Sequence, residues 1–202
     1  MALSSAAHTR ANEVQRSMPP KESVTPAEVL SFTRPTEGYL CPLEANVHGV
    51  EFLKFDIRDY DSGRAVYTSG QDAPAEPVTP HTQAEYENLV RSVRYSFPSD
   101  FLKFKTVRTS LEFKVGDKPL EQFRMIELHY FKDKVVRVYD FTFGFCIPNS
   151  VNTWEAIYDV PQYSRSEMME YISSPFAHKS DSFYFVNNQL IMHNKAEYEY
   201  VP

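Results

Sequence analysis

The chain contains little glycine and little cysteine for its length. Only 6 glycines and 2 cysteines, Cys41 and Cys146, occur among 202 residues. Two distant cysteines are too few for a disulfide scaffold, and neither has a metal-ligand spacing, so we predict two reduced thiols. No apolar run is long enough to cross a bilayer, and the N-terminus lacks the apolar core of a signal peptide. We therefore expect a cytoplasmic protein without stable membrane insertion.

Motifs for catalysis and cofactor binding are also missing. The sequence has no Gly-rich phosphate loop, no Gly-x-Ser-x-Gly, no Cys-x-x-Cys and no His-Glu-x-x-His. The net charge of −6 argues against a general nucleic-acid role. A basic run at Lys103, Lys105, Arg108 and Lys114 alternates with apolar residues, which is typical of the solvated face of paired strands. We expect a protein that is not an enzyme and that holds no metal or cofactor.

Aromatic residues, in contrast, are abundant. The 15 Phe and 13 Tyr favour sheets over a helical bundle. In residues 139–147 every odd position is large and apolar, and every even position is small or polar, so a strand would carry all the large groups on one face. These odd positions are Tyr139, Phe141, Phe143, Phe145 and Ile147. The alternation alone does not distinguish a filled core from a cavity for an apolar ligand.

Short alternating segments separated by turn residues predict most of the chain as strands. The predicted strands are 50–59, 64–69, 93–97, 101–107, 110–115, 123–131, 135–147, 183–186, 190–193 and 196–200. Helices are predicted at 25–32, after a capping-box sequence, and at 164–173. Residues 70–90 are expected to form a loop with one helical turn near 85–89, and residues 148–163 to be irregular.

This pattern predicts an all-β protein, most simply an immunoglobulin-like antiparallel β-sandwich with short helices. A β-barrel is the alternative architecture. Residues 1–23 are polar and rich in Ser and Ala, so we predict a disordered N-terminal tail, followed by one domain over residues 24–202.

The predicted strand 123–131 places polar groups on an apolar face. Its odd positions are Phe123, Met125, Glu127, His129 and Phe131. A carboxylate on such a face is costly unless it has a partner. Four interpretations stay open: this face is outer and wet, Glu127 forms a structural pair with a His or Tyr, Glu127 recognises a ligand, or the Glu–His pair is catalytic.

Several strings resemble one known family, in order from residue 25 onward. They include Thr-Pro-Ala-Glu-Val-Leu (25–30), Phe-Lys-Val-Gly-Asp-Lys-Pro (113–119), Phe-Arg-Met-Ile-Glu (123–127), Phe-Gly-Phe-Cys-Ile-Pro (143–148), Ser-Asp-Ser-Phe-Tyr-Phe-Val (180–186) and Met-His-Asn-Lys-Ala (192–196). The chain thus resembles the uncoordinated-119 family of lipid-binding chaperones, which is related to the prenyl-binding delta subunit of photoreceptor phosphodiesterase and to Rho GDP-dissociation inhibitor. The chain departs from this family at Leu128, where the family has Arg, and in the 70–90 loop. It also has Asn-Thr-Trp-Glu-Ala (152–156) where the family has Asn-Thr-Cys-Glu-His.

The resemblance implies a sandwich whose two sheets are splayed by an apolar pocket. It implies a non-enzymatic carrier that binds the N-terminal myristoyl group of lipidated proteins, solubilises them and moves them between membranes. The implied cargo is G-protein alpha subunits and ciliary or flagellar proteins, so the cilium or flagellum is a second expected location. A GTP-bound Arf-like GTPase is expected to release the cargo from the carrier. Two alternatives stay open: a prenyl carrier, and a plain interaction module without lipid.

The resemblance also implies residue roles. Tyr95 lies in a further matching string, Val-Arg-Tyr-x-Phe (93–97). Tyr95, Glu127 and Tyr184, by their place in matching strings, are expected near the lipid amide and the first residues of the cargo. The implied pocket lining is Phe55, Phe101, His129, Tyr139, Phe141, Phe143 and Phe145. Leu128 is expected to point away from the pocket, because it follows Glu127 on a strand.

Overall fold

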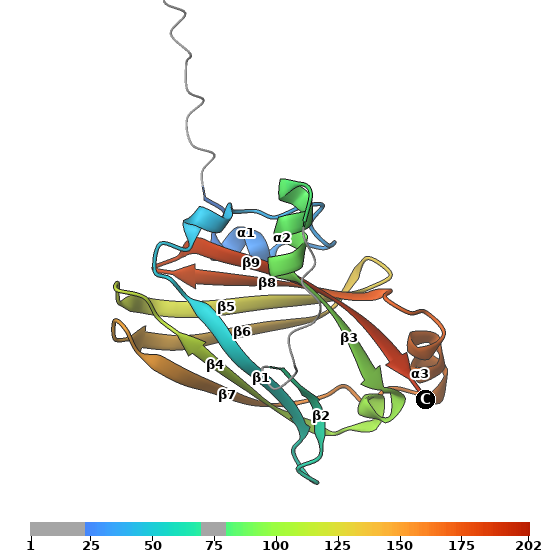
Figure 1. The fold of residues 1–202 in the computed structure, drawn as a ribbon. Helices are drawn as coiled ribbons and strands as arrows, with labels where there is room; N and C mark the ends of the chain where they lie inside the picture. The colour runs from blue at the N-terminus through green and yellow to red at the C-terminus, as the bar shows by residue number, and fades with distance from the viewer. Residues whose placement is uncertain (1–22, 70–79) are drawn as a thin grey trace, which may run out of the picture.

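The computed structural model describes residues 23–69 and 80–202, which form two β-sheets packed face to face (Figure 1). One sheet has four strands in the order β2-β1-β4-β7, and the other has five in the order β3-β9-β8-β5-β6. The predicted β-sandwich is therefore confirmed. The chain forms two separate sheets, and the barrel alternative is wrong.

The four-stranded sheet is antiparallel throughout and contains one strand that the sequence interpretation missed. Its strands are β1 (Glu51–Asp59), β2 (Ala65–Thr68), β4 (Thr106–Lys114) and β7 (Val151–Asp159). Residues 148–163 were expected to be irregular, yet β7 pairs with β4 along its whole length. The predicted strand 101–107 is also wrong in its first half, because a 3₁₀ helix, η2 (Ser99–Lys103), precedes β4.

The five-stranded sheet contains β3 (Ser92–Pro98), β5 (Leu120–Phe131), β6 (Lys134–Cys146), β8 (His178–Val186) and β9 (Gln189–Val201). The β3–β9 pair is parallel, which corrects the expectation of a purely antiparallel fold. The hairpins β5–β6 and β8–β9 turn at Lys132-Asp133 and Asn187-Asn188, all with φ between 49° and 63°. Two consecutive left-handed residues are what the tight turn of a twisted hairpin requires.

Strand β6 contains a bulge that breaks its alternation. Arg124 pairs with Thr142 and Phe123 with Gly144, so one extra residue of β6 lies between these two pairs. Gly144 adopts φ = 100°, a conformation that L side chains rarely adopt. Beyond the bulge the faces exchange: Cys146 is buried, and Phe145 and Ile147 are 59% and 60% exposed.

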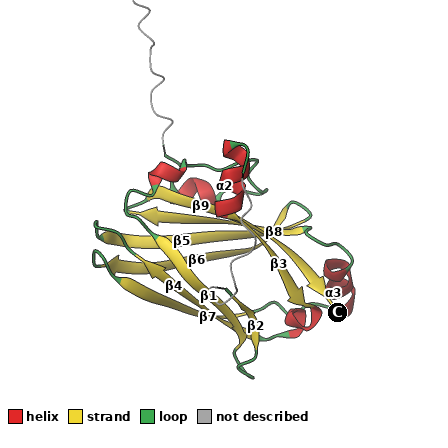
Figure 2. Ribbon diagram, in the orientation of Figure 1, coloured by secondary structure: helices red, strands yellow, loops and turns green. Residues whose placement is uncertain are grey.

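Three α-helices lie outside the strand layers (Figure 2). They are α1 (Pro26–Leu30), α2 (Gln83–Arg91) and α3 (Arg165–Ile172), and each begins with a complete capping box. The helix predicted at 25–32 is confirmed, and the turn expected near 85–89 is a helix of 9 residues. A short 3₁₀ helix, η1 (Leu43–Ala45), precedes β1. None of the described helices is both long enough and apolar enough to span a membrane.

The N-terminal segment, residues 23–41, covers the face of the five-stranded sheet that points away from the four-stranded sheet. Val29 of α1 is fully buried against a cluster that includes Ile126, Leu128 and Tyr130 of β5. Both faces of β5 are therefore covered, which explains why its even positions are apolar as well. Leu128 points away from the opposite sheet, as expected.

A buried polar network fastens this segment. Asp181 accepts hydrogen bonds from Lys195 Nζ at 2.8 Å and from the backbone N–H of Thr36 at 2.9 Å. His193 Nδ1 accepts the backbone N–H of Leu40 at 3.1 Å, which requires its proton on Nε2, 3.3 Å from Asp181 Oδ1. The charge of Asp181 thus has partners from both the sheet and the covering segment, as a buried carboxylate needs.

Candidate functional site: a cavity between the sheets

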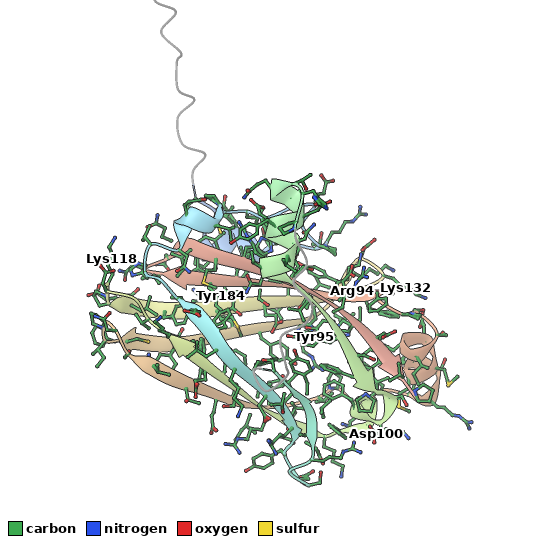
Figure 3. All side chains as sticks on the ribbon, in the orientation of Figure 1. Arg94, Tyr95, Asp100, Lys118, Lys132 and Tyr184 are labelled. Atoms are coloured by element: carbon green, nitrogen blue, oxygen red, sulfur yellow. The ribbon has the colours of Figure 1, made fainter. Side chains whose placement is uncertain are left out.

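A cavity of about 360 Å³ lies between the two sheets. Its wall combines residues of β1, β2, β4 and β7 with residues of every strand of the five-stranded sheet. In Figure 3, Tyr95 lies in the space between the two ribbon layers. The volume falls in the range of about 300 to 1,000 Å³ that is usual for small-molecule sites.

One end of the cavity is apolar and closed. Phe52, Leu111, Met125 and Trp154 line this end. Behind them Phe113 and Phe123 are fully buried, with ring centroids 5.5 Å apart. This end offers a dry surface without charged groups.

The middle of the cavity is polar, because β5 turns Glu127 and His129 inward. Ser182 Oγ donates to Glu127 Oε1 at 3.0 Å, and His129 Nε2 lies 3.5 Å from the same oxygen. Burial acts to raise the pKa of Glu127, but His129 and the hydrogen bonds from His129, Ser182 and Ser180 outweigh it and hold this pKa below its usual value. Glu127 is therefore ionised at neutral pH.

His129 continues into a hydrogen-bonded chain. Its Nδ1 lies 3.0 Å from His178 Nε2, and His178 Nδ1 lies 2.6 Å from the Tyr200 hydroxyl. Burial, His129 and Arg137 hold the pKa of His178 well below its ordinary value, so this imidazole is neutral at pH 7. Tyr200, His178, His129 and Glu127 thus form one continuous chain of polar contacts, in which the tautomer of each imidazole sets the donor. The chain satisfies each of these groups within the wall.

The remaining wall is built from stacked aromatic rings. Tyr95 stacks on Tyr198 at 5.2 Å and meets Tyr67 edge-on at 4.8 Å. Burial raises the pKa of Tyr95, so its hydroxyl is a neutral donor or acceptor. These rings give the cavity an apolar surface with hydroxyl groups at its edges.

The structure places most of the predicted pocket residues on the cavity wall. These are Phe55, Tyr95, Phe101, Glu127, His129, Tyr139, Phe141 and Tyr184. Phe143 and Phe145 do not line it, and their prediction is wrong. Phe143 packs at the apolar end against Phe113 and Trp154, and the bulge at Gly144 turns Phe145 to solvent.

The sequence interpretation missed other wall residues. Trp154, Ala156 and Tyr158 come from β7, where they alternate with exposed residues; this alternation was the signal that could have found them. Arg137 shares the odd face of β6 with Tyr139 and Phe141 and also lines the cavity. Within the described ranges, no cluster of three or more His, Cys, Asp or Glu side chains is placed to hold a metal ion.

Comparison with known proteins agrees with this architecture. The family described as "GMP-PDE, delta subunit" matches residues 44–200, which contain every strand but the last residue of β9. A β-sandwich with an apolar cavity between its sheets therefore defines the class to which this chain belongs, that of the delta-subunit-like lipid-binding carriers.

Relatives within this class are more specific. "Protein unc-119" of Caenorhabditis elegans is 48% identical over 180 residues, which cover 89% of this chain and 81% of that protein. The Drosophila melanogaster unc-119 homolog is 45% identical over 194 residues (88% and 73%), and human unc-119 homolog B is 42% identical over 182 residues (89% and 72%). The chain belongs to the unc-119 family.

Proposed function

We propose that this protein carries the N-terminal myristoyl group of lipidated proteins. The observation that supports this most is the cavity itself, which joins a closed apolar end to an ionised carboxylate, Glu127, in its middle. The acyl chain occupies the apolar end beside Met125 and Trp154. Glu127 and Tyr95 then face the amide and the first residues of the cargo. Binding and release constitute the whole activity, without a catalytic step.

Energetics explain why such a carrier needs polar groups. Burying an acyl chain gains about 0.8 kcal/mol per CH₂ group, and a bilayer offers nearly the same gain. A carrier therefore competes with the membrane only if it also recognises the head of the chain. Glu127 accepts hydrogen bonds, which suits an amide N–H.

The cargo and the release factor follow from the family resemblance. We place G-protein alpha subunits and ciliary or flagellar proteins as cargo, and the cytoplasm and cilium as locations. A GTP-bound Arf-like GTPase releases the cargo by binding a lipid-free conformation more tightly. Because coupling between two ligands is reciprocal, cargo must weaken GTPase binding by the same factor.

A prenyl carrier is the second candidate, favoured by the match to the delta-subunit family. Fluorescence anisotropy separates the two functions. A labelled myristoyl-Gly peptide is expected to bind at micromolar protein more tightly than a labelled farnesyl-Cys peptide, and addition of the GTPase with a non-hydrolysable GTP analogue should lower the anisotropy, whereas its GDP form should not. Farnesyl preference contradicts the myristoyl function, and no binding of either peptide contradicts a lipid carrier.

A further inference from the structure

Arg137 is a cation in the cavity wall with an unused donor. It lies on β6 directly opposite His129 of β5. One guanidinium nitrogen donates to the Tyr139 hydroxyl, and the guanidinium carbon lies 5.4 Å from the Tyr139 ring centroid. The other terminal nitrogen, Nη2, is buried and has no hydrogen-bond partner among the described residues.

Among the described residues, no carboxylate lies within 4.0 Å of the Arg137 guanidinium. In the part of the chain that the structure describes, three other arginines are not exposed, and each has a carboxylate within 4.0 Å: Arg58 with Asp56, Arg91 with Glu87 and Arg124 with Asp140. Arg137 alone of this group has none.

The charge of Arg137 acts on several tyrosines and one histidine around it, among them Tyr139, Tyr158, Tyr171, Tyr200 and His178. Burial raises the pKa of each tyrosine and lowers that of His178, so all of them are neutral at pH 7. A half-buried cation with an unpaired donor and no direct carboxylate partner is costly, and such a cost points to a ligand that supplies the missing acceptor.

The neighbouring strand supplies the opposite chemistry. In the β5–β6 register, Glu127 lies opposite Tyr139, two residues along from the His129–Arg137 pair. Glu127 and Arg137 therefore belong to neighbouring inward-facing residue pairs, so a hydrogen-bond acceptor lies beside a donor. A neutral amide offers a donor and an acceptor together, whereas a free carboxylate on Arg137 would meet the negative charge of Glu127.

We infer that Arg137 donates to the carbonyl oxygen at the head of the bound acyl chain, so that Arg137 selects acylated over prenylated cargo. This inference rests on the proposed carrier function. A prenyl group is attached through a thioether, which has no carbonyl oxygen at this point. Arg137 thus recognises the linkage, and the apolar end recognises the chain.

The test compares three probes on wild type and Arg137→Met. The probes are a labelled myristoyl-Gly peptide, a labelled peptide that carries a saturated chain of the same length through a Cys thioether, and unlabelled myristate as competitor. Loss of a hydrogen bond to a charged donor is expected to weaken the myristoyl peptide about tenfold, with less than about a twofold change for the thioether peptide. For Arg137→Lys, which keeps the charge, the affinity for the myristoyl peptide is expected to lie between those of wild type and Arg137→Met.

Arg108→Met is the matched control, because Arg108 is an exposed arginine on β4 paired with Glu155. It should leave the affinity for every probe unchanged. Arg137→Met should melt at or above the wild-type temperature, because a cation without a direct carboxylate partner is removed, and this excludes unfolding as the cause of weaker binding.

Equal losses of affinity for both peptides, or no loss, would overturn the inference while the carrier function stands. If Arg137→Met lowered the affinity for myristate alone, Arg137 would bind the carboxylate of a free fatty acid, and its role at the amide would be overturned. Wild type that binds no probe would overturn the proposed function and the inference with it.

Discussion

At the scale of single residues, the cavity wall holds the charged groups Glu127 and Arg137 among aromatic rings. Glu127 stays ionised because Ser182 and His129 provide donors, at 3.0 and 3.5 Å from one of its oxygens. Of the four interpretations that the sequence left open, the wet outer face is wrong, since Glu127 lines the cavity. The structural pair is real, and it leaves recognition of a ligand as a compatible second role.

The variant Glu127→Gln tests that second role. Gln keeps the volume and can still accept from Ser182, so we expect a melting temperature within about 4 °C of wild type. Affinity for a myristoyl-Gly peptide is expected to fall about tenfold, because a charged acceptor is lost. Glu155→Gln, at an exposed pair with Arg108, serves as the control and should bind as wild type. Unchanged peptide affinity, or a large drop in melting temperature, would assign Glu127 a purely structural role.

At the scale of elements, β6 shows how one backbone conformation overrides a side-chain pattern. The odd positions of residues 139–147 predict a single face that continues through Phe145 and Ile147. The bulge at Gly144 ends that face after Phe143 and buries Cys146 in its place. Sequence could have suggested this break, because an isolated Gly inside a strand pattern often marks a bulge.

The variant Gly144→Ala tests the bulge. A Cβ at this position meets no atom within 4 Å, so the cost comes from the backbone, which has φ = 100°. We expect a loss of about 1–2 kcal/mol in the free energy of unfolding, measured by urea denaturation. Gly38→Ala is the control, since its Cβ also meets open space and its φ is not positive. An equal effect of both substitutions would show that the left-handed conformation is not the cause.

At the scale of the whole molecule, the two sheets enclose a cavity that is lined largely by aromatic rings. One apolar cluster, which contains Phe113 and Phe123, closes one end of the space between the sheets, and a second, which contains Phe131 and Tyr171, packs at the other end under α3. Residues of both clusters also line the cavity, so packing at its two ends stabilises the sandwich around it.

Filling the cavity is therefore expected to reduce ligand binding before it reduces stability. Phe141 lines the cavity and Phe145 on the same strand is exposed, so Phe141→Trp and Phe145→Trp form a matched pair. In a series of acyl-Gly peptides, Phe141→Trp should weaken the longest chains most, and Phe145→Trp should change none. Anisotropy titrations measure the affinities and thermal melts measure the folding. A uniform loss across chain lengths would indicate that Phe141 does not border the acyl chain.

The sequence by itself determined the local features of this protein. Capping boxes set the starts of the helices, paired left-handed residues set the hairpin turns, and period-2 alternation set most strands, because each depends on neighbouring residues alone. Tertiary structure decided which faces enclose the cavity. The parallel β3–β9 pair, and the meeting of residues from β7 and β6 on one cavity wall, depend on contacts between distant segments. Strand order within each sheet and the stacking of the two sheets fix such contacts, and no local pattern encodes that geometry.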